Sequence, residues 1–316
     1  MPEIHGKALM ATAFITHDDC MKHTMGEYHP ERPARLAAIH DQLITSGIAG
    51  FVKHHEAPLA KMVELGRVHP AEYVESVRMT VPERGIVHLD PDTALCPQTW
   101  DAALRAAGAV VLGTDLVMAK GSKSAFCAVR PPGHHAMRGR AMGFCIFNNV
   151  AVGAKHALEH HGLERVAIAD FDVHHGNGTE DIFSDDPRVL MVGTFQHPFY
   201  PYSGTDNPAS NMANVPLPAG TGSQGFRAAV ERVWLPALER FKPQMIFISA
   251  GFDAHVEDEM AMLRITESDY GWVTTQLKAI ADRYGEGRIV SVLEGGYALS
   301  ALGRSVVAHL RALGGF

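Results

Sequence analysis

The sequence predicts an α/β fold with a largely parallel β-sheet. Short apolar runs alternate with longer amphipathic stretches along the chain, which is the pattern of strands joined by crossover helices. No internal repeat, low-complexity segment or linker rich in proline and serine divides the chain. A chain of 316 residues that is 46% hydrophobic can bury one large core or two smaller ones, and without a linker we expect a single domain.

Six apolar runs are predicted to form buried strands. They are short, and glycine, proline or polar residues flank them, as is typical of strands in a parallel sheet. These runs are LMATAFI (9–15), AFCAV (125–129), VAIAD (166–170), VLMVGT (189–194), MIFISA (245–250) and IVSVL (289–293).

Two of the amphipathic stretches carry clear helix signals. PERPARLAAIHDQLITSG has proline near its predicted N-terminus, and one apolar face is expected to carry Leu36, Ile39, Leu43 and Ile44. TESDYGWVTTQLKAIADRYG opens with a Thr-x-x-Asp pattern that resembles a capping box, and it ends at Gly285. We therefore expect helices within 30–47 and 266–285.

Composition excludes some classes of function. The net charge is -7, and no basic tract appears, so nucleic-acid binding by bulk electrostatics is not expected. The 19 histidines instead favour a soluble protein with site chemistry.

The cysteines and the N-terminal segment bear on the cellular compartment. The four cysteines form no CxxC motif, so we expect buried free thiols in a reducing compartment: Cys20, Cys96, Cys127 and Cys145. The N-terminal segment lacks a basic region followed by an apolar one, and no apolar run has the length of a membrane span. A cytoplasmic location without membrane contact is the resulting expectation.

Chemically active residues follow five of the predicted strands. Four of these segments carry groups that can bind a metal or move a proton, and the one after 189–194 carries aromatic rings. In parallel sheets ligands bind beyond the carboxyl ends of the strands, so we expect the five segments to meet at one rim. In chain order they are RPPGHHAMRGRAMGFCIFNN, FDVHHGNG, FQHPFYPYSG, GFDAH and EGGY.

Three of these residues form a candidate metal site. Asp172 and His174 lie two apart in an extended segment, so both side chains can reach one ion. An isolated Asp-x-His is more often a turn or a helix cap, but Asp253 follows another strand and supplies a third ligand. Three ligands leave an open position, as catalytic zinc requires, and Fe²⁺ or Co²⁺ would also suit them.

The adjacent pair His134 and His135 follows a rigid Pro-Pro-Gly turn. Because imidazole changes protonation near neutral pH, one or both rings can act as base toward a metal-bound water and as acid toward a departing amine. Each ring needs an orienting acceptor, and Asp170 and Asn177 are available.

Three aromatic residues lie on segments of the same predicted rim. Tyr297 follows two glycines, and its hydroxyl can stabilise an oxyanion beside a metal. Phe144 and Tyr200 lie on separate loops, and facing rings would form a narrow slot for a linear aliphatic chain. Taken alone, Tyr297 is better explained as a core aromatic residue after a turn, and ordinary loop packing explains Phe144 and Tyr200 equally well.

Taken together, the motifs resemble the histone deacetylase family, and most closely its class II, bacterial histone deacetylase-like and acetylpolyamine amidohydrolase members. The resemblance covers nearly the whole chain. It implies the arginase/deacetylase fold, with a central eight-stranded parallel sheet flanked by helices, in one catalytic domain over 1–316. The motifs are HPERPARL, RPPGHHA, GFCIFNN, DFDVHHGNGTEDIF, SAGFDAH and EGGY, in this order.

The resemblance also implies roles for individual residues. It implies zinc bound by Asp172, His174 and Asp253. His134 and His135 would be the tandem catalytic histidines, paired with Asp170 and Asn177 respectively, and Asn177 stands where class I relatives carry an aspartate. Tyr297 matches the tyrosine that stabilises the transition state.

Further matches concern the substrate tunnel. Phe144 and Tyr200 match its two aromatic walls, although the second is usually phenylalanine, so a polar group enters the wall here. The remaining tunnel residues are Gly143 beside Phe144, Met260 at the gatekeeper position and Arg35 near the inner end. Asp92 is a candidate residue of the rim.

Family members also bind potassium beside the zinc. Asp170 and the carbonyl groups of Asp172 and His174 would contribute, and Thr194 would replace the usual serine. The segment TFQHPF departs from the family pattern, so the match at Thr194 is loose.

The residues and the resemblance together predict a zinc-dependent amidohydrolase. It would remove acetyl or similar acyl groups from the amine of a lysine side chain or a lysine-like amide. The expected partners are an acetylated lysine peptide or a small acetylated amine, and the oligomeric state is left open.

Three alternatives remain. A dimanganese arginase needs additional carboxylates, but Gly176 and His255 stand at those positions. An acetylpolyamine amidohydrolase would use acidic residues at the tunnel mouth, although a solvated loop explains them too and Met260 is uncharged; the candidates are Asp92, Glu257, Asp258 and Glu259. A metal-dependent binding module without turnover is the third alternative, and it conflicts with a complete catalytic set.

Overall fold

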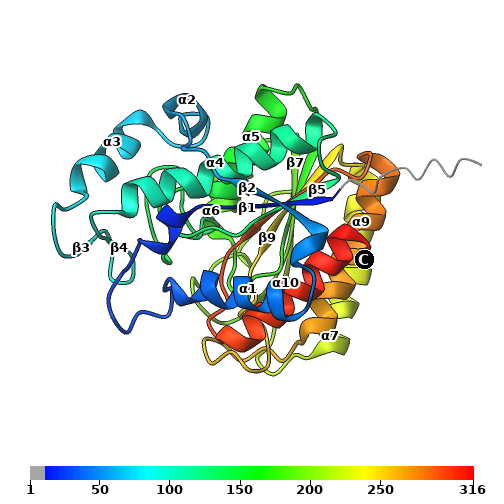
Figure 1. Ribbon diagram of the computed structural model, residues 1–316. Coiled ribbons are helices and arrows are strands. Elements are labelled where there is room, and N and C mark those ends of the chain that lie inside the picture. The colour runs from blue at the N-terminus through cyan, green and yellow to red at the C-terminus, as the bar shows by residue number, and fades with distance from the viewer. Residues whose placement is uncertain (1–10) are drawn as a thin grey trace, which may run out of the picture.

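An eight-stranded parallel sheet lies at the centre of the computed structural model, which describes residues 11–316 (Figure 1). Every neighbouring pair of strands in this sheet is parallel, as predicted. From one edge to the other the strands are β2 (Val52–Glu56), β1 (Thr12–Thr16), β5 (Ser124–Cys127), β10 (Ile289–Leu293), β9 (Met245–Ala250), β6 (Val166–Asp170), β7 (Val189–Gln196) and β8 (Met212–Leu217).

Helices cover both faces of the sheet (Figure 1). One layer contains α2 (Met62–Leu65), α3 (Ala71–Thr80), α4 (Thr99–Met118), α5 (Asn149–Glu159) and α6 (Asn177–Phe183). The other layer contains α1 (Ala34–Thr45), α7 (Ser223–Ala229), the π-helix η3 (Val230–Trp234), α8 (Leu235–Phe241), α9 (Glu267–Tyr284) and α10 (Leu299–Gly314). Two short 3₁₀ helices, η1 (Asp18–Met21) and η2 (Ala49–Phe51), complete the set.

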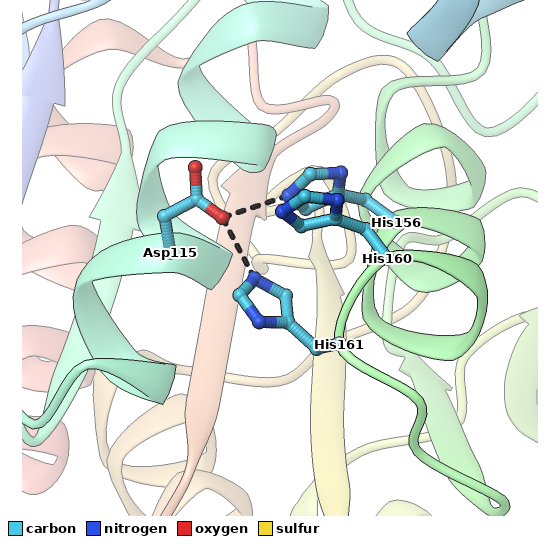
Figure 2. A group of neighbouring side chains, drawn as sticks. All are labelled: Asp115, His156, His160 and His161. Atoms are coloured by element: carbon cyan, nitrogen blue, oxygen red, sulfur yellow. Dashed lines mark hydrogen bonds and ion pairs between the residues drawn. The ribbon is translucent and has the colours of Figure 1, made fainter.

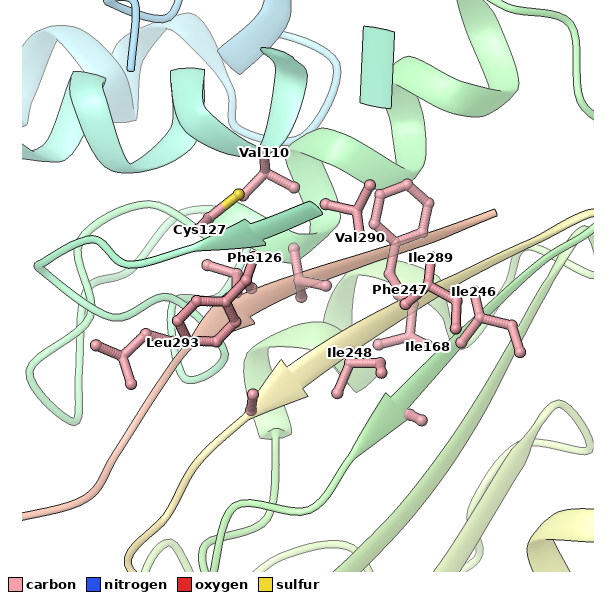
Figure 3. Close-up of a cluster of buried hydrophobic side chains, with 14 of the residues drawn as sticks. Val110, Phe126, Cys127, Ile168, Ile246, Phe247, Ile248, Ile289, Val290 and Leu293 are labelled. Atoms are coloured by element: carbon pink, nitrogen blue, oxygen red, sulfur yellow. The ribbon is translucent and has the colours of Figure 1, made fainter. Parts of the chain in front are cut away.

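The core lies on both faces of the central strands, because successive side chains of a strand point to opposite sides (Figure 3). Phe247 and Val290 lie toward α4 and α5, and the Cβ position of Gly153 in α5 approaches Phe247. Phe126 points the other way and meets the ring of His309 in α10. Burial on both faces explains why the sequences of these strands are continuous apolar runs.

All six predicted strands are present. In the first, Leu9 and Met10 lie outside the described residues, and β1 begins at Thr12. Two edge strands, β2 and β8, were missed because edge strands are less buried: β2 reads VKHHE, and β8 contains a proline. A small antiparallel ribbon of β3 (Val87–His88) and β4 (Ala94–Leu95) was also missed.

The two predicted helices form, with one error. The capping box of α9 is present between Thr266 and Asp269, and Gly285 is the residue that ends this helix. In α1, however, Ile44 is 59% exposed, so its placement on the buried face was wrong. At 3.6 residues per turn, Ile44 lies about 80° around the helix axis from Leu36. Leu43, which is buried, lies only about 20° from Leu36.

All four cysteines are free and buried, as expected. Among the described residues no helix combines the length and the apolar character needed to cross a bilayer.

The strands that precede the five chemically active segments are consecutive neighbours in the sheet: β5, β10, β9, β6 and β7. Because all five are parallel, their carboxyl ends lie along one edge. The predicted convergence is therefore confirmed, and it is this topology that assembles the site.

Candidate active site

A cavity of about 160 Å³ opens at the carboxyl ends of these strands. Loops from all five strands contribute to it, together with the loop that follows β3. Its walls are formed by Asp92, Pro132, His134, His135, Gly143, Phe144, His174, Phe199, Tyr200, Met260, Gly295 and Tyr297.

Two carboxylates and one imidazole meet at the inner end of the cavity. His174 Nδ1 lies 3.0 Å from Asp172 Oδ1 and 3.3 Å from Asp253 Oδ2. Asp253 Oδ1 accepts a hydrogen bond from the backbone N–H of Val173, but Oδ2 is buried without a hydrogen-bond partner among the described residues. A buried carboxylate oxygen in this state indicates a place for a cation.

The electrostatics of this cluster also favour a cation. Burial and then the charge of Asp172 raise the pKa of Asp253 to about 6. Burial opposes a charge on His174, yet the hydrogen bond with Asp172 and the nearby charges of Asp172 and Asp253 raise its pKa to about 9. The cluster therefore needs positive charge, and its one-imidazole, two-carboxylate donor set fits a divalent ion such as zinc.

The backbone around the cluster fixes the two carboxylates. The N–H of Gly295 donates to Asp172 Oδ2 at 2.8 Å, and the N–H of His174 donates to Asp172 Oδ1 at 2.9 Å. A Cβ atom on Gly295 would lie 2.0 Å from Asp253 Oδ2, so only glycine allows this close approach. The strand ends of β6, β9 and β10 thus hold the three side chains together.

The tandem histidines have different partners and different charges. His134 Nδ1 lies 3.0 Å from Asp170 Oδ2; burial disfavours its charge, but Asp172 and Asp170 raise the pKa of His134 well above its usual value. His135 Nδ1 lies 2.7 Å from Asn177 Oδ1. Burial, followed by the charges of His134 and His174, lowers the pKa of His135 well below its usual value.

These partners also fix the tautomer of His135. The amide oxygen of Asn177 only accepts, so Nδ1 of His135 carries the proton and Nε2 keeps its lone pair. The site therefore presents one charged and one neutral imidazole side by side, with ring centroids 4.1 Å apart.

Tyr297 forms part of the cavity wall beside the candidate metal-binding cluster. Its backbone N–H donates to Asp258 Oδ2 at 2.6 Å, which fixes the loop after β10. The guanidinium of Arg35 lies 5.0 Å from the centre of its ring. Arg35 itself is buried behind Tyr297 and does not form part of the cavity wall.

Aromatic rings form the sides of the cavity. Phe144 meets Tyr297 edge-on at 6.1 Å, and Tyr200 meets His135 edge-on at 5.3 Å. Gly143 has a φ of 56°, and a Cβ atom there would lie 2.3 Å from the His135 ring. Met260 also lines the cavity.

Phe199 is an additional wall residue that the sequence analysis missed. Its ring stacks on His174 at 5.6 Å. The segment FQHPFYPYSG was recognised as aromatic, but spacing does not show which of its rings turn inward.

The acidic residues near the mouth differ in their surroundings. Asp92 lines the cavity, and its Oδ1 accepts from the N–H of Gly143 at 3.1 Å. Asp258 is buried, and backbone N–H groups of Met260, Tyr297 and Ala298 already occupy its carboxylate oxygens. Glu257 pairs with Arg304, and Glu259 is exposed.

The residues expected to bind potassium lie at the carboxyl end of β6, just beyond it, and on the neighbouring strand β7. Asp170 is at the end of β6, its register partner in β7 is Gly193, and Thr194 is the next residue. Asp170 Oδ1 accepts from the N–H of Asp172 at 3.1 Å. The topology thus brings these residues together.

Glu294 is a further residue that the sequence analysis left without a role. It is fully buried, and its Oε2 accepts from the N–H groups of Gly133 and His134 at 2.7 and 3.1 Å. Burial raises the pKa of Glu294 to about 7, although the charge of His134 and these N–H groups oppose the shift. Its position directly after a buried strand was the available signal.

Comparison with known proteins identifies the family to which this chain is similar. Residues 29–313 match the family model of the histone deacetylase domain. A probable deacetylase of Archaeoglobus fulgidus is 38% identical over 97% of this chain and 87% of its own length. The histone deacetylase-like amidohydrolase of Pseudomonas aeruginosa is 35% identical, over 91% of this chain and 82% of its own length.

Two further relatives widen the comparison. The polyamine deacetylase HDAC10 of Mus musculus is 36% identical over 96% of this chain, which corresponds to 48% of that protein. The crystal structure of the HDA15 HD domain superposes with a TM-score of 0.91 at 34% identity, covering 98% of this chain and 89% of that one. The family model spans most of the sequence and the fold agrees with it, so the chain belongs to the histone deacetylase family.

Proposed function

We propose that this protein is a zinc-dependent amidohydrolase that removes acetyl or similar acyl groups from the amine of a lysine side chain or a lysine-like amide. The main support for the proposal is that three groups of side chains meet at one cavity. These are the cluster of Asp172, His174 and Asp253, the histidine pair with opposite pKa shifts, and Tyr297. When bound, zinc would polarise the amide carbonyl and lower the pKa of a water molecule.

His135 carries both proton transfers in this proposal, and His134 supplies positive charge. Neutral His135 has a free lone pair on Nε2, so it accepts the proton of the attacking water. His134, held by Asp170 in its charged form, adds positive charge beside the developing oxyanion. The proton on His135 then passes to the nitrogen of the leaving amine, and the amide C–N bond breaks to give carboxylate and amine.

Tyr297 supplies the hydrogen-bond donor for the oxyanion. Burial, followed by the charge of Asp253, raises the pKa of its phenol well above the usual value, so the hydroxyl keeps its proton. Phe144 and Tyr200 wall the cavity and exclude water from a linear aliphatic chain.

The structural cation completes the proposal. We assign potassium to Asp170, to the carbonyl groups of Asp172 and His174, and to Thr194, since the carboxyl end of β6 and the adjacent strand β7 bring them together. Fe²⁺ or Co²⁺ would also suit the donor set at the catalytic position.

A small acetylated polyamine is the second candidate substrate. Asp92 lines the cavity and lies beside Asp90, and burial and the contact with Asp90 raise its pKa. Carboxyl groups at the mouth favour a cationic substrate. Met260, which lines the same cavity, favours an uncharged chain.

The deciding experiment compares the wild type with Tyr297→Phe on a fluorogenic acetyl-lysine peptide and on acetylated putrescine, spermidine and cadaverine. We expect peptide turnover, a fall in kcat of about a hundredfold or more in the variant, and unchanged zinc content. A preference for the polyamines of about tenfold or more, roughly 1.4 kcal/mol, would select the second substrate. Zinc binding without turnover of any substrate would instead support a binding module.

A further inference from the structure

A second group of metal-ligating side chains lies between α4 and α5. Figure 2 shows the carboxylate of Asp115, on α4, facing three imidazole rings that come from the end of α5 and the residues after it. One donor atom from each of the four residues lies within 4.8 Å of the others: Asp115, His156, His160 and His161.

This group is remote from the catalytic cavity. Helix α4 leads into β5, and α5 leads into β6. The carboxyl ends of these helices therefore lie near the starts of parallel strands, whereas the catalytic cluster lies at the ends of such strands. The two groups share no residue.

The backbone holds the histidines in place before any metal ion binds. His156 and His160 are four residues apart on one helix face, and their rings stack at 4.6 Å with an interplanar angle of 15°. The N–H groups of His160 and His161 both donate to the carbonyl of His156, at 2.9 and 3.3 Å. The negative end of the α5 dipole adds to the attraction for a cation.

The group is also open to an ion from solvent. The side chain of Asp115 is 46% exposed and that of His161 is 21% exposed. Asp115 Oδ1 lies 2.7 Å from Nε2 of His161, and ligand atoms on one zinc ion are roughly 3.3 Å apart, so a small movement would admit the ion.

Arg67 determines which ring nitrogen of His156 carries the proton. Its Nη1 lies 2.8 Å from His156 Nδ1, and a guanidinium only donates, so Nδ1 accepts and Nε2 carries the proton. That proton points at Asp115 Oδ1, 2.7 Å away. His156 thus orients the carboxylate, as hydrogen-bonded neighbours of metal ligands do.

We propose that Asp115, His160 and His161 form a second binding site for a divalent transition-metal ion such as Zn²⁺, with His156 as the hydrogen-bond donor that positions Asp115. The site ties α4 to α5. Water fills the remaining coordination positions.

The test measures bound zinc per chain after equilibrium dialysis of the full-length holoenzyme against buffered micromolar Zn²⁺. We expect the wild type to hold about one more zinc ion than His160→Gln/His161→Gln, with deacetylase activity unchanged. The matched control is His54→Gln/His55→Gln on β2, where neighbouring strand residues point to opposite faces and cannot chelate together. Equal zinc content in the wild type and the first double variant would overturn the proposal.

A second variant tests the role of His156. Arg67→Met removes the donor but keeps the side-chain stem, so the His156 proton can move to Nδ1 and Nε2 becomes a fourth ligand. We expect tighter zinc binding at this site by isothermal titration calorimetry, and an affinity equal to that of the wild type would contradict the assigned role. Because each comparison is a difference between variants, it does not depend on whether the catalytic centre binds zinc.

Discussion

Single atoms determine whether the cluster of Asp172, His174 and Asp253 can hold a metal. Asp253 Oδ2 is buried without a partner, and Gly295 leaves room for it and for Asp172 Oδ2. A Cβ atom on residue 295 would lie 2.0 Å from the first of these oxygens and 2.7 Å from the second. At the scale of the residue, a missing side chain is therefore as important as the ligands themselves.

Gly295→Ala should abolish metal binding. The added methyl group would push the Asp253 carboxylate away from His174, so we expect little zinc per chain and a loss of turnover of about a hundredfold or more. Metal analysis after dialysis and steady-state kinetics measure both effects. Gly139→Ala is the matched control, because a Cβ atom there meets nothing within 4 Å and both readouts should stay at the wild-type level. Normal zinc content in Gly295→Ala would contradict the role given to this glycine.

At the scale of the element, a buried histidine joins α9, α10 and β10. The hydroxyl of Thr274 donates to the carbonyl of Tyr270 at 2.6 Å, so it accepts from His309 Nδ1, also at 2.6 Å. Ser291 then donates to His309 Nε2 at 2.8 Å. Burial lowers the pKa of His309 to about 3, and both ring nitrogens are satisfied in the neutral form.

His309 should make the fold sensitive to acid. Its folded pKa is about 3 against 6.5 when exposed, so below about pH 6.5 the unfolded chain binds the extra proton and the free energy of unfolding falls. The contribution of His309 should lower the free energy of unfolding by about 2 kcal/mol between about pH 6.5 and pH 5. Urea unfolding at both pH values measures it.

The corresponding variant is His309→Gln, which we expect to be less stable at neutral pH but to lose about 2 kcal/mol less on acidification. His88→Gln, on the exposed ribbon strand β3, is the control and should follow the wild type. An unchanged pH dependence in His309→Gln would show that other groups carry the acid sensitivity.

At the scale of the whole molecule, a buried ion-pair triad joins distant parts of the chain. Glu31 lies between Arg35 and Arg130, and all three are fully buried. Arg130 lies just beyond β5, while Arg35 on α1 donates to the carbonyl of Gly296 after β10 at 2.6 Å. Burial opposes the charge on Glu31, but Arg130 and Arg35 lower its pKa to about 2.

Glu31→Gln should destabilise the protein strongly. It leaves two buried guanidinium groups without their counter-charge, which typically costs about 3–5 kcal/mol. The midpoint of urea unfolding should fall accordingly, and turnover should also fall because Arg35 supports Tyr297. Glu27→Gln, at an exposed position, provides the control. If the free energy of unfolding fell by less than about 1 kcal/mol, the triad would not be needed to hold the segment that contains Glu31.

The parallel sheet could be predicted from the sequence alone, and so could the edge of the sheet at which the candidate site lies. Strands buried on both faces must be apolar throughout, so the six inner strands, and the active segments after five of them, could be predicted from composition and order. The same reasoning predicted the proximity of Asp172, His174 and Asp253, because parallel strand ends share an edge. The edge strands β2 and β8 were not readable, because partial exposure removes that pattern.

Only the tertiary structure decided the contacts between groups that are far apart in the chain. Glu294 holds the loop of His134 across 160 positions, and Arg67 contacts His156 across 89. Burial and neighbouring charge give His134 and His135 opposite pKa shifts although the two are adjacent in sequence. Such properties depend on dielectric surroundings and on distances of a few ångströms, which no local pattern of residues contains.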